Sequence, residues 1–310
     1  MKRKVRLAAV VVVVMAVFTG LSVAPAAANH ESAHAAQLCS ALPLKSQNTF
    51  GLNAFAGEGS ALRGEPGAMG KDVAFVATPG SKKVMATMIP VHFHVLRAGL
   101  SYEEGNLSLA KVRKQIDVLN RAFAGGYGGA STPWQFELAS VDWTTNARWF
   151  TMGYGSPAER EAKEALHRGG PNELNIYTGT AGGYLGWATW PWMQKEHPKW
   201  DGIVVDFESL PNGTAERFDL GQTATHEAGH WFGLYHTFQG GCSASGDGVE
   251  DTPRQVVATS GCPEGQDSCT RYEGLDAIHN YMDYSDDACY SEFSPGQVER
   301  ASGFFALYRA

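Results

Sequence analysis

The stretch THEAGHWFGLYH, Thr225–His236, decides the fold of this chain. On a helix His226 and His230 are four residues apart, so their imidazoles project from one face with Glu227 beside them. The H-E-x-x-H spacing therefore predicts two ligands to one metal ion and a neighbouring general base. The alternative is an amphipathic helix whose histidines pack in the core or face solvent.

His236 is the third metal ligand that this stretch predicts. The chain must leave the helix before His236 can reach the same ion, and Gly233 tolerates the positive φ of such a helix end. Three neutral imidazoles that leave one position open to water are typical of catalytic zinc, whereas a structural zinc has four protein ligands. The motif thus predicts a zinc hydrolase in which Glu227 is the base.

Periodicity on the amino-terminal side of the motif predicts an α/β domain. Ile89–Leu96 alternates as a strand does, and Leu107–Phe123 places apolar residues at helical spacing. Turns marked by Gly and Pro separate four further candidate strands. These are Trp134–Leu138, Glu173–Tyr177, Tyr184–Trp190 and Gly202–Phe207.

The first residues predict export. Four basic residues within the first six precede the apolar run Leu7–Phe18, and Ala26–Ala28 supplies a small-residue cleavage site. Residues 1–28 are therefore typical of a secretory signal peptide. The alternative is an uncleaved membrane anchor, which so short an apolar run disfavours.

The segment after the signal peptide is rich in Ala, Gly and Ser and shows little periodicity. It predicts a pro-segment over residues 29–62 and a linker over residues 63–85. A catalytic domain over residues 86–310 follows, with an upper part over 86–233 and a lower part over 234–310.

Composition and charge limit the classes of partner that the chain can bind. The 310 residues are 44% hydrophobic and 18% charged, which excludes a disordered or fibrous chain. The formal net charge is −7, and removal of the four positive charges of the signal peptide leaves −11. A dense basic face is missing, so we expect no nucleic-acid partner. We expect a secreted, extracellular monomer with no membrane partner that acts on proteins or peptides.

Several motifs around the histidines resemble the pappalysin family of metzincin zinc metallopeptidases. They are THEAGHWFGLYHTF, GDGVEDTP, NYMDYSDDAC and FSPGQ, with GYLGWATWP and DGIVVDF ahead of the helix. The resemblance covers about Ile89 to Tyr308. It implies a zincin-like α/β fold, in which a twisted mixed sheet with a backing helix and an active-site helix stands above an irregular, disulfide-stapled subdomain. It also implies hydrolysis of internal peptide bonds.

The resemblance implies further roles at the cleft. Met282 would form a hydrophobic floor under the ligands, although a methionine here could equally be ordinary core. Tyr284 would reach toward the metal or the reacting carbonyl oxygen. Leu185, Gly186 and Trp187 resemble the edge strand that binds an extended peptide through its backbone. The alternative is that the tryptophans pack in the core.

Two acidic positions carry more specific expectations. Asp287 resembles a carboxylate that selects Arg or Lys after the cleaved bond, and the alternative is a loop-capping aspartate. The loop over residues 246–253 resembles a calcium site of the family, with Asp247 and Thr252 as side-chain ligands. The alternative is a solvated acidic loop.

The five cysteines divide into four and one. Four lie in the lower part and allow three pairings; the resemblance favours Cys242–Cys269 and Cys262–Cys289. Cys39 lies alone in the pro-segment, where its thiolate could occupy the fourth zinc position of a latent zymogen. The alternative is a free thiol in a discarded segment.

Two other functions are compatible with the motif. A zinc protein that binds without cleaving would need a broken ligand set or a missing base, and the sequence has neither defect. A hydrolase of another bond, such as an amidase or an esterase, would use the same chemistry. The sequence therefore favours a secreted zinc endopeptidase, made as a latent zymogen, that uses Zn²⁺ and Ca²⁺.

Overall fold

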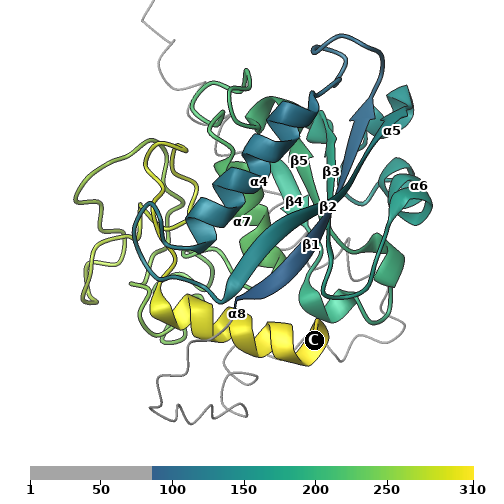
Figure 1. The fold of residues 1–310 in the computed structure, drawn as a ribbon. Helices are drawn as coiled ribbons and strands as arrows, with labels where there is room; N and C mark the ends of the chain where they lie inside the picture. The colour runs from purple at the N-terminus through teal and green to yellow at the C-terminus, as the bar shows by residue number, and fades with distance from the viewer. Residues whose placement is uncertain (1–85) are drawn as a thin grey trace, which may run out of the picture.

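The computed structural model describes residues 86–310, and its centre is a five-stranded mixed sheet (Figure 1). The strands are β1 (Thr87–Arg97), β2 (Trp134–Thr145), β3 (Leu174–Gly179), β4 (Gly186–Ala188) and β5 (Ile203–Asp206). Their order across the sheet is β2-β1-β3-β5-β4. All neighbours pair in parallel except β4, which runs antiparallel to β5 at one edge.

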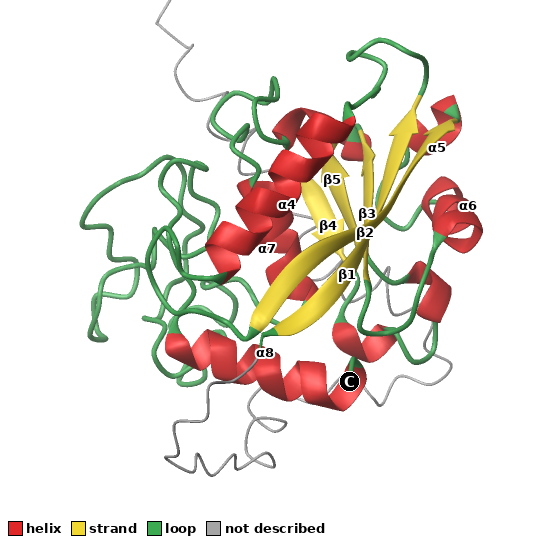
Figure 2. Cartoon of the chain, viewed as in Figure 1, coloured by secondary structure: helices red, strands yellow, loops and turns green. Residues whose placement is uncertain are grey.

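Helices cover both faces of this sheet. They are α4 (Leu109–Phe123), α5 (Ala147–Phe150), α6 (Pro157–Leu166), α7 (Gln222–Trp231) and α8 (Pro295–Tyr308), with short 3₁₀ turns at Ala181–Gly183, Pro191–Met193, Pro198–Trp200 and Phe207–Ser209. Figure 2 shows α4 and α7 on one face, α5 and α6 on the other, and α8 across the lower end of the sheet. None of the helices in residues 86–310 is both long and apolar enough to span a bilayer.

The alternation of β1 builds two different faces. Ile89, Val91, Phe93 and Val95 point into the main core beneath α4 and α7. His94 points to the opposite face, where its ring stacks 4.6 Å from that of Tyr177. The strand predicted from this alternation over Ile89–Leu96 is thus confirmed.

Other predicted elements differ from the structure at their ends. The helix expected from Leu107 begins at Leu109, because the Ser108 hydroxyl caps it by accepting a hydrogen bond from the Lys111 N–H at 3.2 Å. β2 continues to Thr145 rather than Leu138, since it pairs with the whole length of β1. The expected strand Tyr184–Trp190 shortens to β4, because its partner β5 has only four residues.

The lower part has little regular secondary structure before α8. The disulfides Cys242–Cys269 and Cys262–Cys289 cross it, which is the pairing that the resemblance implied. A fully buried carboxylate, Asp283, accepts hydrogen bonds from the Thr259 N–H at 3.0 Å and the Thr259 hydroxyl at 2.5 Å. Covalent and polar crosslinks thus supply the rigidity that strands supply in the upper part.

A buried ion pair, which the sequence analysis did not foresee, joins α8 to the rest of the domain. Arg309 lies just after α8 and makes two hydrogen bonds to Asp201, at 2.8 and 3.1 Å. Both side chains are at most 1% exposed. Arg309 also covers the ring of Trp231 at 3.6 Å and donates to its carbonyl oxygen at 2.9 Å. Burial alone would raise the pKa of Asp201, but the charge and hydrogen bonds of Arg309 outweigh burial and hold it below its ordinary value.

We predict that Arg309→Met destabilises the domain by about 3–5 kcal/mol, because it leaves the Asp201 charge buried without a partner. Denaturant unfolding followed by tryptophan fluorescence measures the change. The matched control is Arg148→Met, which breaks the exposed ion pair with Glu161 and should cost far less, because solvent screens that pair. Equal losses for the two variants would contradict the importance of the buried pair.

Candidate active site

Helix α7 carries the predicted catalytic motif and is buried along its whole length. It ends at Trp231, and the chain then turns through Gly233 at φ +97°, as the sequence predicts. A Cβ atom on Gly233 would lie 2.7 Å from the Phe304 ring, so no larger residue fits this turn. The turn returns His236 to the face of α7 that carries His226 and His230.

The three imidazoles converge on one point. The Nε2 atom of His230 lies 3.1 Å from Nε2 of His226 and 2.9 Å from Nε2 of His236. The other ring nitrogen, Nδ1, of His226 lies 2.6 Å from the carbonyl oxygen of Tyr281, and Nδ1 of His230 lies 2.7 Å from that of Leu234. A carbonyl oxygen only accepts, so these two Nδ1 atoms carry the protons and both Nε2 lone pairs face the shared point.

Electrostatics keep this cluster neutral. Burial lowers the pKa of His226 to about 4 and holds the pKa values of His230 and His236 well below the ordinary value, with mutual repulsion adding to the effect for these two. Lone pairs of buried neutral imidazoles at such distances repel one another unless a cation lies between them. Three neutral nitrogen ligands are a donor set that suits Zn²⁺ with an open position.

Glu227 lies against the edge strand. A Cβ atom on Gly186 of β4 would lie 2.8 Å from Cγ and 2.9 Å from Oε1 of Glu227, so the absence of a side chain there makes room for the carboxylate. Burial raises the pKa of Glu227 well above its ordinary value. A carboxylate with a raised pKa beside a metal site is suited to accept and return a proton.

Met282 packs against α7 between two of the histidines, and Tyr284 lies beside the imidazoles. Met282 is fully buried, and its Sδ atom occupies the space where a Cβ atom on Gly229 of α7 would stand. The ring of Tyr284 lies 5.7 Å from that of His226 and 4.8 Å from that of His236. The loop that carries these two residues therefore contacts both α7 and the histidine rings.

The edge strand offers backbone groups to a peptide. The Leu185 carbonyl oxygen accepts from the Asp206 N–H at 2.7 Å, and the Thr189 N–H donates to the Gly202 carbonyl oxygen at 3.1 Å, so alternate residues of this segment bond to β5. Gly186 and Ala188 then direct their N–H and C=O groups to the other side of β4. Within residues 86–310 no strand pairs with that side.

Trp187, the expected substrate contact, lies between Gly186 and Ala188 on β4. The backbone of Trp187 pairs with Val204 of β5, and its side chain is only 4% exposed on the far face of the sheet. Its indole Nε1 donates to Oε1 of Glu159 on α6 at 2.7 Å. Lys163 lies 2.8 Å from the same carboxylate. Trp187 therefore anchors β4 from behind, which is the core-packing alternative that the sequence left open.

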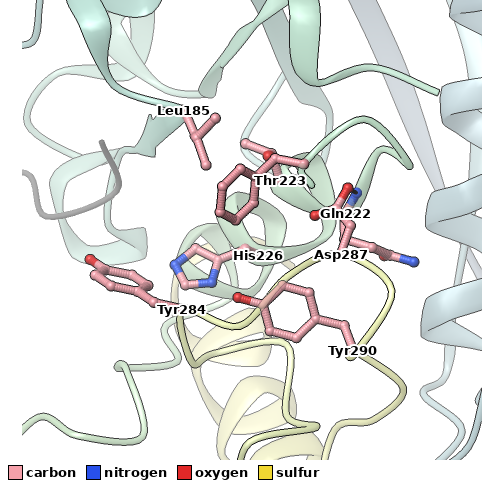
Figure 3. A pocket seen from close by; sticks show the side chains of 8 residues that line it. Leu185, Gln222, Thr223, His226, Tyr284, Asp287 and Tyr290 are labelled. Atoms are coloured by element: carbon pink, nitrogen blue, oxygen red, sulfur yellow. Dashed lines mark hydrogen bonds between the residues drawn. The ribbon is translucent and has the colours of Figure 1, made fainter. Parts of the chain in front are cut away.

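A pocket opens beside His226 (Figure 3). Apolar and aromatic side chains surround it, and Figure 3 shows Gln222 and Asp287 together at one side of it. Its lining residues are Leu185, Phe218, Gln222, Thr223, His226, Tyr284, Asp287 and Tyr290. Leu185 and Asp287, which the sequence analysis proposed as substrate contacts from separate motifs, thus line one pocket.

Asp287 has the loop-capping role that the sequence offered as the alternative, and it also lines the pocket. One carboxylate oxygen accepts from the N–H groups of Leu220 at 2.9 Å and Gln222 at 3.2 Å, which caps the start of α7. The residue is 3% exposed, and burial raises its pKa to about 7 in spite of these hydrogen bonds. An acidic group is thereby held at the pocket close to its titration point at neutral pH.

The expected calcium loop is compact. The Thr252 hydroxyl donates to Asp247 Oδ1 at 2.7 Å and to the Val249 carbonyl oxygen at 3.0 Å. Burial raises the pKa of Asp247 to about 6. The other expected special ligand, Cys39, lies outside the described residues.

Some lining residues were not found from the sequence. Gln222 and Thr223 lie about one turn before His226 on α7, so helical spacing could have found them. Phe218 and Tyr290 come from irregular segments, where no periodic signal exists. The contact between Gly186 and Glu227 depends on a long-range approach that spacing does not encode.

Comparison with known proteins agrees with this geometry. The family model described as pregnancy-associated plasma protein-A matches residues 199–306. An extracellular metalloprotease of Sordaria macrospora is 43% identical over 244 residues, which cover 77% of this chain and 82% of that protein. An extracellular metalloprotease of Pyricularia oryzae is 45% identical over 228 residues, covering 73% of this chain and 77% of that one.

A solved structure leads to the same family. Mature mirolysin of Tannerella forsythia, in complex with a cleaved peptide, superposes with a TM-score of 0.59 at 31% identity, covering 71% of this chain and 92% of that one. Sequence relatives, structural neighbour and active-site geometry agree: this chain belongs to the pappalysin family of metzincins and is a zinc metallopeptidase.

Proposed function

We propose that this metallopeptidase is an extracellular endopeptidase that cleaves internal peptide bonds, with Glu227 as general base. The observation that carries the proposal is the position of Glu227, which follows His226 on α7 and lies in contact range of Gly186 on the edge strand. An extended peptide added to β4 needs no free terminus, which favours cleavage within a chain. Relatives named extracellular metalloproteases and the expected signal peptide support secretion.

His226, His230 and His236 would hold the zinc ion. When bound, Zn²⁺ supplies the Lewis acidity that activates a water molecule near neutral pH. Glu227 accepts a proton from that water and delivers it to the departing amine. Tyr284, beside His226 and His236, would donate a hydrogen bond to the reacting carbonyl oxygen. The backbone groups of Gly186 and Ala188 hold the peptide extended across these residues.

We predict that Glu227→Gln retains zinc but loses activity by at least about 10²-fold, because the amide cannot accept the proton. Release of casein fragments by the processed enzyme measures activity, and elemental analysis measures zinc. A chelator should abolish wild-type cleavage, and the matched control Glu137→Gln, exposed on β2, should behave as wild type.

Three results would contradict these assignments. Loss of zinc from Glu227→Gln would make Glu227 a ligand rather than a base. Full activity of that variant would remove its catalytic role. Zinc-loaded wild-type enzyme that hydrolyses simple esters or amides but no protein would favour the alternative hydrolase.

We further propose that Asp287 selects Arg or Lys after the cleaved bond. Its carboxylate lies at the pocket beside His226, where the side chain of that residue would enter. Because its pKa is raised to about 7, the group is charged above that pH and neutral below it. Attraction to a basic side chain is therefore present above about pH 7 and is lost as the pH falls through this value.

We predict that Asp287→Asn lowers the preference for Arg over Gln at this position by about 10- to 100-fold, as expected for a hydrogen bond between charged groups. The ratio of kcat/KM for two peptides that differ only there measures the preference. In the wild type this ratio should fall between pH 8 and pH 6, whereas Asp287→Asn should show no such slope. Asp286→Asn is the control, because Asp286 pairs with Arg217 instead. An unchanged ratio in Asp287→Asn would refute the selection.

Latency and calcium complete the proposal. Cys39 would supply a thiolate to the zinc ion in the precursor, since three protein ligands leave one position free. Asp247 and Thr252 would bind calcium. Their side-chain oxygens lie 2.7 Å apart, so both could be ligands of one ion.

We predict that a Cys39→Ala precursor cleaves casein before processing, while the wild-type precursor stays inactive. Ser40→Ala, one residue along, is the matched control and should stay latent. Equal latency of the Cys39→Ala and wild-type precursors would remove the thiolate from the mechanism of latency.

A further inference from the structure

A row of aromatic side chains continues the cleft beyond the end of β4. Trp190 follows β4 by two residues, and its ring lies 5.1 Å from that of His230 and 5.3 Å from that of Tyr235. Trp192 stacks on Trp190 at 5.0 Å with an interplanar angle of 7°. All three aromatic side chains remain partly exposed. They lie beside the second histidine, whereas the pocket of Asp287 lies beside the first.

The surroundings of this row hold it in place. Pro191 is buried, and it favours the extended conformation that Trp190 adopts, at φ −72° and ψ 149°. Trp192 packs on Phe304 of α8 at 5.7 Å. The guanidinium of Arg300 lies 4.6 Å from the ring of Tyr235. A ligand that docks on Trp190 and Tyr235 would therefore meet a preformed surface and lose little side-chain entropy on binding.

The direction of a bound peptide follows from three successive points along the edge strand. Leu185 lines the pocket for the residue after the cleaved bond. Gly186 lies against Glu227 and marks the position of the reaction. Ala188 and then Trp190 come next, so residues before the cleaved bond must extend toward Trp190. The peptide consequently runs antiparallel to β4.

We infer that Trp190 and Tyr235 form a second specificity site, which binds an aromatic or large aliphatic side chain on the amino-terminal side of the cleaved bond. This inference rests on the proposed function. Trp190 is four residues beyond Gly186, or about 13 Å at strand spacing, so the side chain belongs to a residue roughly two to four positions before the cut. Aromatic walls bind such side chains by burying apolar area and by ring stacking.

Internally quenched peptides test the site on the processed wild-type enzyme. They share one sequence after the cut, beginning with Arg, and carry Phe, Leu, Ala or Asp at each of the four preceding positions in turn. We expect Phe or Leu to raise kcat/KM about tenfold over Ala at one of these positions. Trp190→Ala should bring this ratio to about 1, and Trp190→Phe should retain most of it.

The control is Trp143→Ala, an exposed tryptophan of β2 at the opposite edge of the sheet, which should leave the ratio unchanged. Zinc content is measured for each variant. Equal rates for Phe and Ala at all four positions in the wild type would overturn the site, and this result needs no variant. A wild-type ratio in zinc-loaded Trp190→Ala would also overturn it. Failure to cleave any peptide would instead overturn the proposed function, on which the site rests.

Discussion

The active site depends on three buried imidazoles that remain neutral. Because water is excluded from them, each is most stable when neutral, and each then presents one lone pair to a common point. The backbone carbonyl oxygens of Tyr281 and Leu234 accept from Nδ1 of His226 and His230, so Nε2 carries the lone pair in both rings. Both carbonyls belong to the lower part of the domain. Tyr281 lies within the loop that Cys262–Cys289 closes and two residues before the buried Asp283, so these crosslinks help to orient His226.

The short strand β4 organises the cleft on both of its faces. On one face Gly186 leaves room for Glu227, and on the other Trp187 is tied to Glu159 of α6. A shift of β4 by one residue would exchange these faces and direct a bulky indole at the Glu227 carboxylate. The ion pair between Glu159 and Lys163 therefore helps to define the cleft although it lies on the far side of the sheet.

The sequence predicted those parts of the fold and site that repeat or lie close together in the chain. Spacing alone identified His226, His230 and His236, and alternation identified β1. Strand lengths could not be predicted, because β2 and β4 end where their partners allow. The lining of the pocket could not be predicted from the sequence either, because only the tertiary fold brings Phe218 and Tyr290 close to His226. Arg309 resembles a surface residue in sequence, and its burial follows from the single carboxylate that receives it.

The ion pair between Arg309 and Asp201 also links the active-site helix to a residue that is made late in synthesis. Synthesis and export proceed from the amino terminus, so the motif Thr225–His236 is made well before Arg309. Until Arg309 arrives, Asp201 has no counter-charge and the end of α7 at Trp231 lacks its cover. A chain made only as far as α8 therefore holds the three histidines and Glu227, with the end of helix α7 not yet covered. Arg309 thereby completes the burial of the helix that carries the active-site motif.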